Sequence, residues 1–120
     1  MPDNYVPDVY LEMLRDMRDR PRLVKVPESD IVEVYTWLSE LFKLVEDCDL
    51  RGAIISLSEL SQIKGQIVGW AETLMEREPP GPRYDELRYI SSVVQEVEDK
   101  AMAAALSRLE KECLCRCVPR

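Results

Sequence analysis

Apolar side chains recur at steps of three and four residues along four long segments of this chain, and this spacing predicts amphipathic helices. The predicted helices cover approximately residues 7–19, 30–46, 50–77 and 84–113, followed by a tail at residues 114–120. The apolar stripe of the first helix comprises Val6, Val9, Tyr10, Met13, Leu14 and Met17. The connections are short, so successive helices should pack side by side around one core. We therefore expect an all-α fold, a four-helix bundle-like single domain.

An extended connector is predicted between the first and second helices. Pro21 ends the first helix because the residue before a proline avoids helical dihedral angles, and a second proline follows six residues later. Between the two prolines, Leu23 and Lys25 should point to one side of the chain, and Val24 and Val26 to the other. No other segment offers a strand to pair with this one, so we interpret it as a connector and not as part of a sheet.

Other residues indicate where helices begin or end and where they pack closely. Asp30, with Glu33 three residues later, fits a capping box at the start of the second helix. Gly65 and Gly69 lie four apart inside the third helix, where each glycine costs about 1 kcal/mol relative to alanine. We expect the close approach of another helix to be the reason for them. A Pro-Pro-Gly-Pro run at residues 79–82 ends the third helix.

The residue types argue against catalysis. The chain has no histidine, which is the commonest general base and a frequent metal ligand. Glu96, Glu98 and Asp99 are neighbouring carboxylates, but we place Glu96 and Asp99 on the solvated face of the fourth helix. The glycines lie in helices or beside prolines, and not in a loop that would bind phosphate. We expect no enzyme activity, no catalytic residue and no cofactor.

The chain is acidic overall and basic in one place. Its 23 acidic and 16 basic residues give a formal net charge of −7. A phosphate backbone would repel such a chain as a whole, so we expect no direct contact with nucleic acid. The exception is a basic cluster of Arg15, Arg18, Arg20, Arg22 and Lys25. This cluster is either a set of solvated charges near a helix end or a surface that a partner contacts.

The second helix has more apolar positions than one core-facing stripe requires, which indicates a protein-binding surface. Trp37 and Leu44 lie seven apart on its second face, and Trp70 adds an aromatic edge on the third helix. Core packing is the alternative interpretation for these aromatic residues. We expect other protein subunits as partners, in a homo- or hetero-oligomer. The predicted partner-binding residues are Arg18, Arg20, Arg22, Lys25, Trp37, Leu44 and Trp70.

Four cysteines leave three interpretations open. Cys113, Cys115 and Cys117 form a C-x-C-x-C run, and Cys48 lies far from them in the sequence. The run does not have the C-x-x-C spacing of a zinc knuckle, so we assign no metal site. A disulfide from Cys48 to one of the three is the second interpretation, since intracellular proteins of hyperthermophiles carry disulfides. The third is a set of free thiols, with Cys113 continuing the apolar stripe from Leu109.

The expected location is the cytoplasm. No apolar run reaches the length of about 18 residues that a membrane-spanning helix needs. The N-terminus lacks the basic-then-apolar pattern of a secretory signal. One asparagine and three glutamines beside abundant glutamate, arginine and proline give a thermophile-like composition.

A longer pattern begins near the N-terminus. It consists of Tyr10-Leu11-Glu12-Met13-Leu14-Arg15, then Arg20-Pro21-Arg22-Leu23-Val24-Lys25-Val26-Pro27-Glu28-Ser29-Asp30, then a helix with Val34, Tyr35 and Leu38. Over residues 5–45 the chain thereby resembles the start of the small subunits of the archaeal GINS complex, in which a helix leads through a proline-flanked connector into a long amphipathic helix. The resemblance implies the helical domain only, without the small β-domain that those subunits usually carry. It also implies a non-enzymatic scaffold of the replicative helicase, which bridges the MCM ring and a RecJ-like partner.

We therefore expect a non-enzymatic helical scaffold or adaptor subunit of an intracellular complex, with a DNA-replication assembly of the GINS type as the candidate. The alternative is a small acidic regulator or inhibitor of a nucleic-acid-processing protein or a nucleoprotein complex. Between Glu28 and Glu59, eight acids stand against two bases, and such a stretch can imitate a phosphate backbone. A third hypothesis is direct binding of RNA or DNA through the basic cluster.

Overall fold

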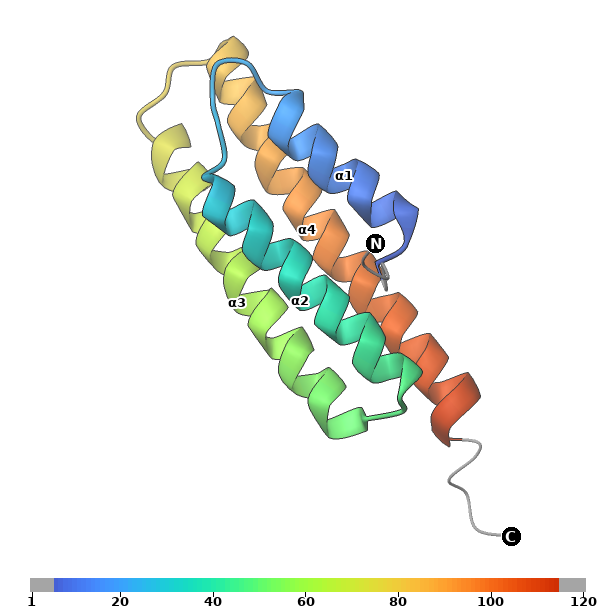
Figure 1. Cartoon of the computed structure of the whole chain (residues 1–120). Coiled ribbons are helices and arrows are strands. Elements are labelled where there is room, and N and C mark those ends of the chain that lie inside the picture. The colour runs from blue at the N-terminus through green and yellow to red at the C-terminus, as the bar shows by residue number, and fades with distance from the viewer. Residues whose placement is uncertain (1–5, 115–120) are drawn as a thin grey trace, which may run out of the picture.

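The computed structural model describes residues 6–114, and four α-helices account for most of them (Figure 1). The helices are α1 (Asp8–Asp19), α2 (Glu28–Glu46), α3 (Leu50–Met75) and α4 (Pro82–Arg108), and a π-helical segment, η1 (Leu109–Leu114), continues α4. Within the described residues there is no strand. The predicted all-α, bundle-like fold is confirmed, and the predicted helix ends lie within one to two residues of the observed ones except at the end of the fourth helix.

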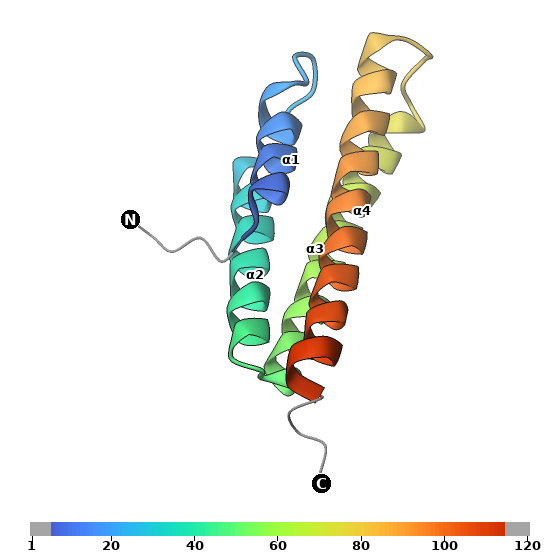
Figure 2. The same ribbon diagram turned by 90° about the vertical axis from the view of Figure 1, so that its right-hand side faces the viewer.

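The helices α2, α3 and α4 form the body of the bundle, and α1 is a shorter addition to it. The helix α3 packs along both α2 and α4, whereas α2 and α4 contact each other much less. The helix α1 packs on α2 and α4 and covers only part of their length (Figures 1 and 2). Its far end leads into the connector, which runs back across the bundle to α2.

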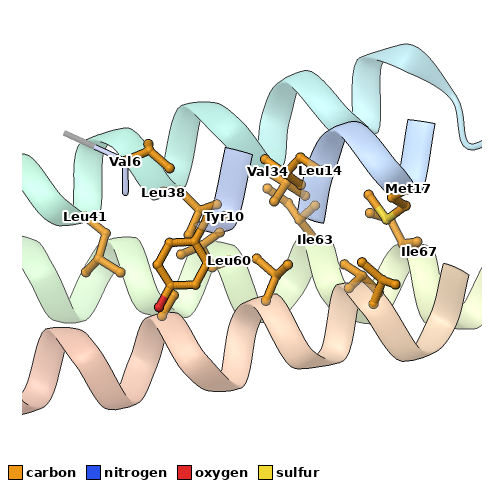
Figure 3. Close-up of a cluster of buried hydrophobic side chains, with 14 of the residues drawn as sticks. Val6, Tyr10, Leu14, Met17, Val34, Leu38, Leu41, Leu60, Ile63 and Ile67 are labelled. Carbon is orange, nitrogen blue, oxygen red and sulfur yellow. The ribbon is translucent and has the colours of Figure 1, made fainter. Parts of the chain in front are cut away.

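Side chains from all four helices meet in one core. Met17, Leu38, Leu41, Leu87 and Ile90 are fully buried. Figure 3 shows residues of α1, α2 and α3 that point toward one another in this core, together with Val6, which lies just before α1. They include Val6, Tyr10, Leu14, Val34, Leu60, Ile63 and Ile67. Burial of this apolar surface is the main force that holds the helices together.

An aromatic pair joins α1 to α2. The rings of Tyr10 and Phe42 stack with their centroids 5.6 Å apart, and burial raises the pKa of the Tyr10 hydroxyl. One prediction for α1 is wrong: Val9 does not join the core but is 49 % exposed. The reason is that α1 rests on two helices with one narrow face, formed by Tyr10, Leu14 and Met17, and Val9 lies beside that face.

The ends of α2 and α3 are capped differently from one another. The helix α2 begins at Glu28, with Pro27 as its N-cap and no side-chain capping bond, so the predicted capping box at Asp30 is wrong. A proline needs no partner for an N–H group, and it already holds the dihedral angle of a helix start. The helix α3 is capped by Asp49, whose side chain accepts a hydrogen bond of 2.9 Å from the Gly52 N–H.

The small residues of α3 and α4 differ in their surroundings. Ala101 and Ala105 are completely buried in α4. Gly65 and Gly69 are exposed, and a Cβ atom added to either would meet no atom of the described chain within 4 Å. The prediction that another helix of this chain approaches these two glycines is therefore wrong. None of the described helices is both long enough and apolar enough to cross a membrane.

Candidate functional site

A groove of about 230 Å³ lies between α1 and α2. Its walls are apolar, formed by Leu11 and Leu14 of α1 and by Ile31 and Val32 of α2. Leu14 and Ile31 are core residues, while Val32 is 53 % exposed. The groove forms because Leu11 of α1 and Val32 of α2 lie on the outer side of the core residues Leu14 and Ile31. The apolar surface therefore continues from the core to the solvent. We refer to it as the α1–α2 groove.

Charged side chains form the rim of the α1–α2 groove. Arg15 and Arg18 lie on the α1 side and Glu28 on the α2 side, and the phenol ring of Tyr35 completes the lining. The sequence places the two arginines on the groove side because they follow Leu11 and Leu14 at helical steps of four. A bound group would therefore meet an apolar floor and a rim with two guanidinium groups.

The basic cluster gathers around one acid, Asp19. Arg18 donates two hydrogen bonds to it, from Nε to Oδ1 at 2.8 Å and from Nη2 to Oδ2 at 3.1 Å. These bonds hold the pKa of the Asp19 carboxyl below its ordinary value, and the positive charges of Arg18, Lys25 and Arg15 act in the same direction. Arg15, Arg18 and Lys25 thus lie within electrostatic reach of Asp19 on the exposed surface.

The connector that carries the other bases is fastened to α4 by a single carboxylate. Glu86 accepts hydrogen bonds from the backbone N–H groups of Arg22 at 3.0 Å, Leu23 at 2.7 Å and Val24 at 2.9 Å. These bonds lower the pKa of Glu86 below its ordinary value. Arg83 adds a bond of 3.3 Å to the Leu23 carbonyl oxygen. A connector without regular structure is therefore fixed at three consecutive residues.

The side chains of the connector alternate as predicted. Val24 and Val26 are buried, while Leu23 and Lys25 are exposed. Arg20, at the end of α1, lies over the ring of Tyr89 of α4 with its guanidinium carbon 5.2 Å from the ring centroid. This cation–π contact holds the start of the connector against α4.

The predicted partner-binding residues fall into two groups in the structure. The basic residues Arg18, Arg20, Arg22 and Lys25 are all exposed. Arg18 lines the α1–α2 groove, whereas Arg20 lies over Tyr89 of α4. Trp37, Leu44 and Trp70 are half-buried and pack against the core. Leu44 in particular lies close to the start of α3, where its Cδ2 atom would be 3.0 Å from a Cβ atom added to Gly52.

Sequence reasoning did not single out the groove walls or Glu86. Leu11 and Val32 were not distinguished from other apolar positions, because helical spacing cannot tell which side of a helix its neighbours leave open. Glu86 lies more than sixty residues from the backbone groups it binds, so no local pattern connects them. The one available signal was its place in the first turns of a helix that follows a proline-rich break.

A second depression lies on the other side of α1, against α4. It has a volume of about 270 Å³, with Val9, Met13, Tyr89 and Val93 as its apolar lining and Asp16, Glu96 and Lys100 as its charged lining. The exposed Val9 described above belongs to it. Because acidic and basic groups alternate around it, this depression offers no single charge for a partner to match.

A disulfide lies at the end of the bundle where α2 turns into α3. It joins Cys48, in that turn, to Cys113 of η1, with a Cα–Cα distance of 5.4 Å. This agrees with the second of the three interpretations of the cysteines. Cys115 and Cys117 lie outside the described residues. Among the residues that are described, no three His, Cys, Asp or Glu side chains come together as a metal ion would require.

The fold and the groove define an all-α protein with an apolar, arginine-rimmed groove near one end. Comparison with the models of known protein families, with curated proteins and with solved structures finds no match to this chain.

Proposed function

We propose that this protein is a non-enzymatic helical adaptor that binds a segment of another protein in the α1–α2 groove. The observation that carries this proposal is the combination of an apolar lining, in which Val32 is exposed and Leu11 partly exposed, with two arginines on the rim. The bound segment would place one apolar side chain against Leu11 and Val32, and acidic neighbours beside Arg15 and Arg18. Buried apolar anchors with charged residues around them are the usual source of affinity in protein interfaces.

The volume of the groove favours a side chain over a small molecule. Pockets for small ligands and cofactors measure roughly 300–1,000 Å³ and enclose most of the ligand, whereas this groove measures about 230 Å³ and is open. One leucine or phenylalanine side chain fits such a space. The polar groups of its lining are two arginines, a glutamate and a tyrosine, which include no nucleophile with an adjacent base.

The charge around the groove favours an acidic segment. Arg15 and Arg18 line it directly, with Glu28 as the one acid of the lining, and two further bases, Arg22 and Lys25, lie on the adjoining connector. Glu86 and Tyr89 hold that connector in place, so the positive charges are arranged before a partner arrives. A surface arranged in advance loses less entropy on binding.

The proposed cellular setting is a DNA-replication complex of the GINS type. Its support is the resemblance over residues 5–45, and every residue that lines the α1–α2 groove falls between positions 11 and 35. The groove thus lies within the part of the chain that carries the resemblance. The proposed location is the cytoplasm of a thermophile, in which a disulfide such as Cys48–Cys113 can persist.

A peptide-display selection tests this function with a defined probe. The full chain is used to select from a random peptide library, and the selected peptides are then measured against two variants. Val32→Asp places a charge in the groove wall. Leu106→Asp is the matched control, because Leu106 is 47 % exposed and lies on α4, outside the groove.

The expected result is a consensus with one apolar residue beside Asp or Glu, whose affinity falls at least tenfold for Val32→Asp and stays unchanged for Leu106→Asp. Peptides that bind both variants equally would refute the groove as the binding site. A basic consensus would instead support the alternative function, an acidic regulator that occupies a basic surface.

A further inference from the structure

The outer face of α3 has no charged residue along most of its length. From Gly52 to Ala71 the only charged residues are Glu59 and Lys64. Lys64 is turned toward α4, where its Nζ lies 3.3 Å from the carboxylate of the buried Glu98, and Glu59 is half-buried. The other exposed positions between Gly52 and Ala71 are all uncharged, and we call them the outer α3 face: Ile54, Ile55, Ser58, Ser61, Gln62, Gly65, Gln66 and Gly69.

This face is unusual for the chain that carries it. Charged residues make up 32 % of the sequence, and other exposed helix surfaces, such as that of α4, carry many of them. The outer α3 face instead exposes two large apolar side chains, with Ile54 54 % and Ile55 55 % accessible to solvent. A long uncharged face with exposed isoleucines is typical of a surface that a partner covers.

The two glycines of the face have no role in the described chain. Glycine in the middle of a helix is destabilising relative to alanine, and close approach of another backbone is the usual compensation. Nothing in the described chain comes within 4 Å of a Cβ atom added to Gly65 or Gly69. A partner outside the chain accounts for them, because the missing side chains leave a hollow in which a second helix can lie close.

The order of bulky residues and glycines along the face allows two copies of it to fit together. The bulky residues Ile54 and Ile55 stand at one end, the hollow at Gly69 lies at the other, and Gln62 is midway between them in sequence. Ser58 and Gly65 lie between these ends, on either side of Gln62 and at similar distances from it along the helix. At 1.5 Å per residue, the face from Ile54 to Gly69 is about 22 Å long. A two-fold axis near Gln62 would place the isoleucines of each copy over Gly69 of the other, which is how isologous interfaces are built.

We propose that two copies of this chain associate through the outer α3 face, with the two α3 helices antiparallel. The occupant is a second copy because the same face holds both the bulky isoleucines and the glycines that can receive them. A two-fold interface requires both on one face, whereas an interface with a different protein does not. The absence of charge on this face also favours association. Each copy carries a net charge of −7, so an interface without acidic residues keeps like charges apart. A single helix pair buries less area than a standard interface, so we expect a dimer with a dissociation constant in the micromolar range, at or below roughly 300 µM.

Sedimentation velocity of the full chain at roughly 1–300 µM tests the association. Gly65→Glu with Gly69→Glu fills the hollow and adds charge, and the monomer tolerates both substitutions because the two positions open onto solvent. Ser92→Glu with Ala103→Glu is the matched control, since both residues are exposed on α4. The wild type and the control should dimerise equally, and the glycine variant should dimerise at least tenfold more weakly.

A monomeric wild type throughout that range, or a glycine variant that dimerises like the wild type, would overturn the proposal. A photoreactive amino acid at Gln62 then checks the register. The expected cross-link joins α3 to α3 of the other copy, close to position 62, and a cross-link to any other helix would overturn the two-fold arrangement. Neither measurement uses a peptide ligand, so its outcome is independent of the groove between α1 and α2.

Discussion

Removal of the Cys48–Cys113 disulfide should destabilise the protein strongly. The bond connects residues 65 positions apart, and it ties the turn after α2 to η1 at the end of the chain that is described. In the chain-entropy description, a cross-link over a loop of this length stabilises the folded state by about 4 kcal/mol at 25 °C. For a domain of this size, about 4 kcal/mol corresponds to a fall in melting temperature of roughly 15 °C.

The assay is thermal unfolding followed by circular dichroism. All proteins carry Cys115→Ala and Cys117→Ala, so that no other pairing can replace the native one. Cys48→Ala with Cys113→Ala is compared with its parent, with and without a phosphine reductant. Alanine is chosen because Cys113 is buried, and a serine hydroxyl would lack a partner there. The parent should melt roughly 15 °C lower in reductant, whereas the double variant should not respond to reductant.

A parent that melts at the same temperature with and without reductant would refute this account of the disulfide. Titration of two free thiols in the native parent would refute it as well. A fall of only a few degrees in the double variant would show that the unfolded chain stays compact without the cross-link, so that the loop entropy is overestimated.

Three further predictions concern individual residues. Glu86→Ala should speed hydrogen exchange of the three connector amides that the Glu86 carboxylate holds. The folded-state pKa of Glu86 lies below its ordinary value of 4.5, so Glu86 stabilises the fold above about pH 4.5 and this stabilisation is lost as the pH falls; the variant should therefore show a smaller difference in stability between pH 7 and pH 3 than the wild type. Lys64→Met should lower the free energy of unfolding by about 3 kcal/mol in urea titrations, because it leaves the buried Glu98 carboxylate without its cation, and an unchanged midpoint would show that water replaces the lysine. Gly65→Ala and Gly69→Ala should each stabilise the monomer by up to about 1 kcal/mol, and a loss of stability in either would contradict the open space found at both positions.

The architecture follows from the spacing of apolar residues. Four segments with helical periodicity correspond to the four helices, and the connector alternates as its sequence indicates. The least accurate helix end is that of α4, where the π-helical segment η1 begins at Leu109. Leu109 and Cys113, four apart, are both buried, so the apolar stripe continues across this boundary, and its spacing does not mark the change from α-helical to π-helical hydrogen bonds.

Contacts between distant residues could not be read from the sequence. The cysteine spacing leaves three partners for Cys48, and only the position of η1 beside the turn after α2 selects Cys113. Likewise, Glu86 acts on backbone groups that carry no sequence signal, since every residue other than proline has the same N–H group.

Two of the three errors have a common physical cause. Val9 follows the apolar period of α1 but lies beyond the narrow face that α2 and α4 cover. For Gly65 and Gly69, the sequence indicated close packing, and nothing in the described part of the chain packs there. In both cases the neighbours of a helix decide the outcome, and they are not encoded in the period of that helix. The capping box at Asp30 failed for a local reason, because Pro27 already begins the helix.

The most direct test of the central claim uses a photoreactive amino acid at position 32, in the wall of the α1–α2 groove. The full chain is irradiated in lysate of the cells that produce it, and the cross-linked peptides are sequenced. The same amino acid at Leu106 is the control, since that side chain is comparably exposed outside the groove. The account predicts that position 32 links to one segment of one protein, at an apolar residue beside Asp or Glu, and that position 106 does not. The same set of proteins linked from both positions, or no cross-link at position 32, would contradict the proposal that the groove binds a protein segment.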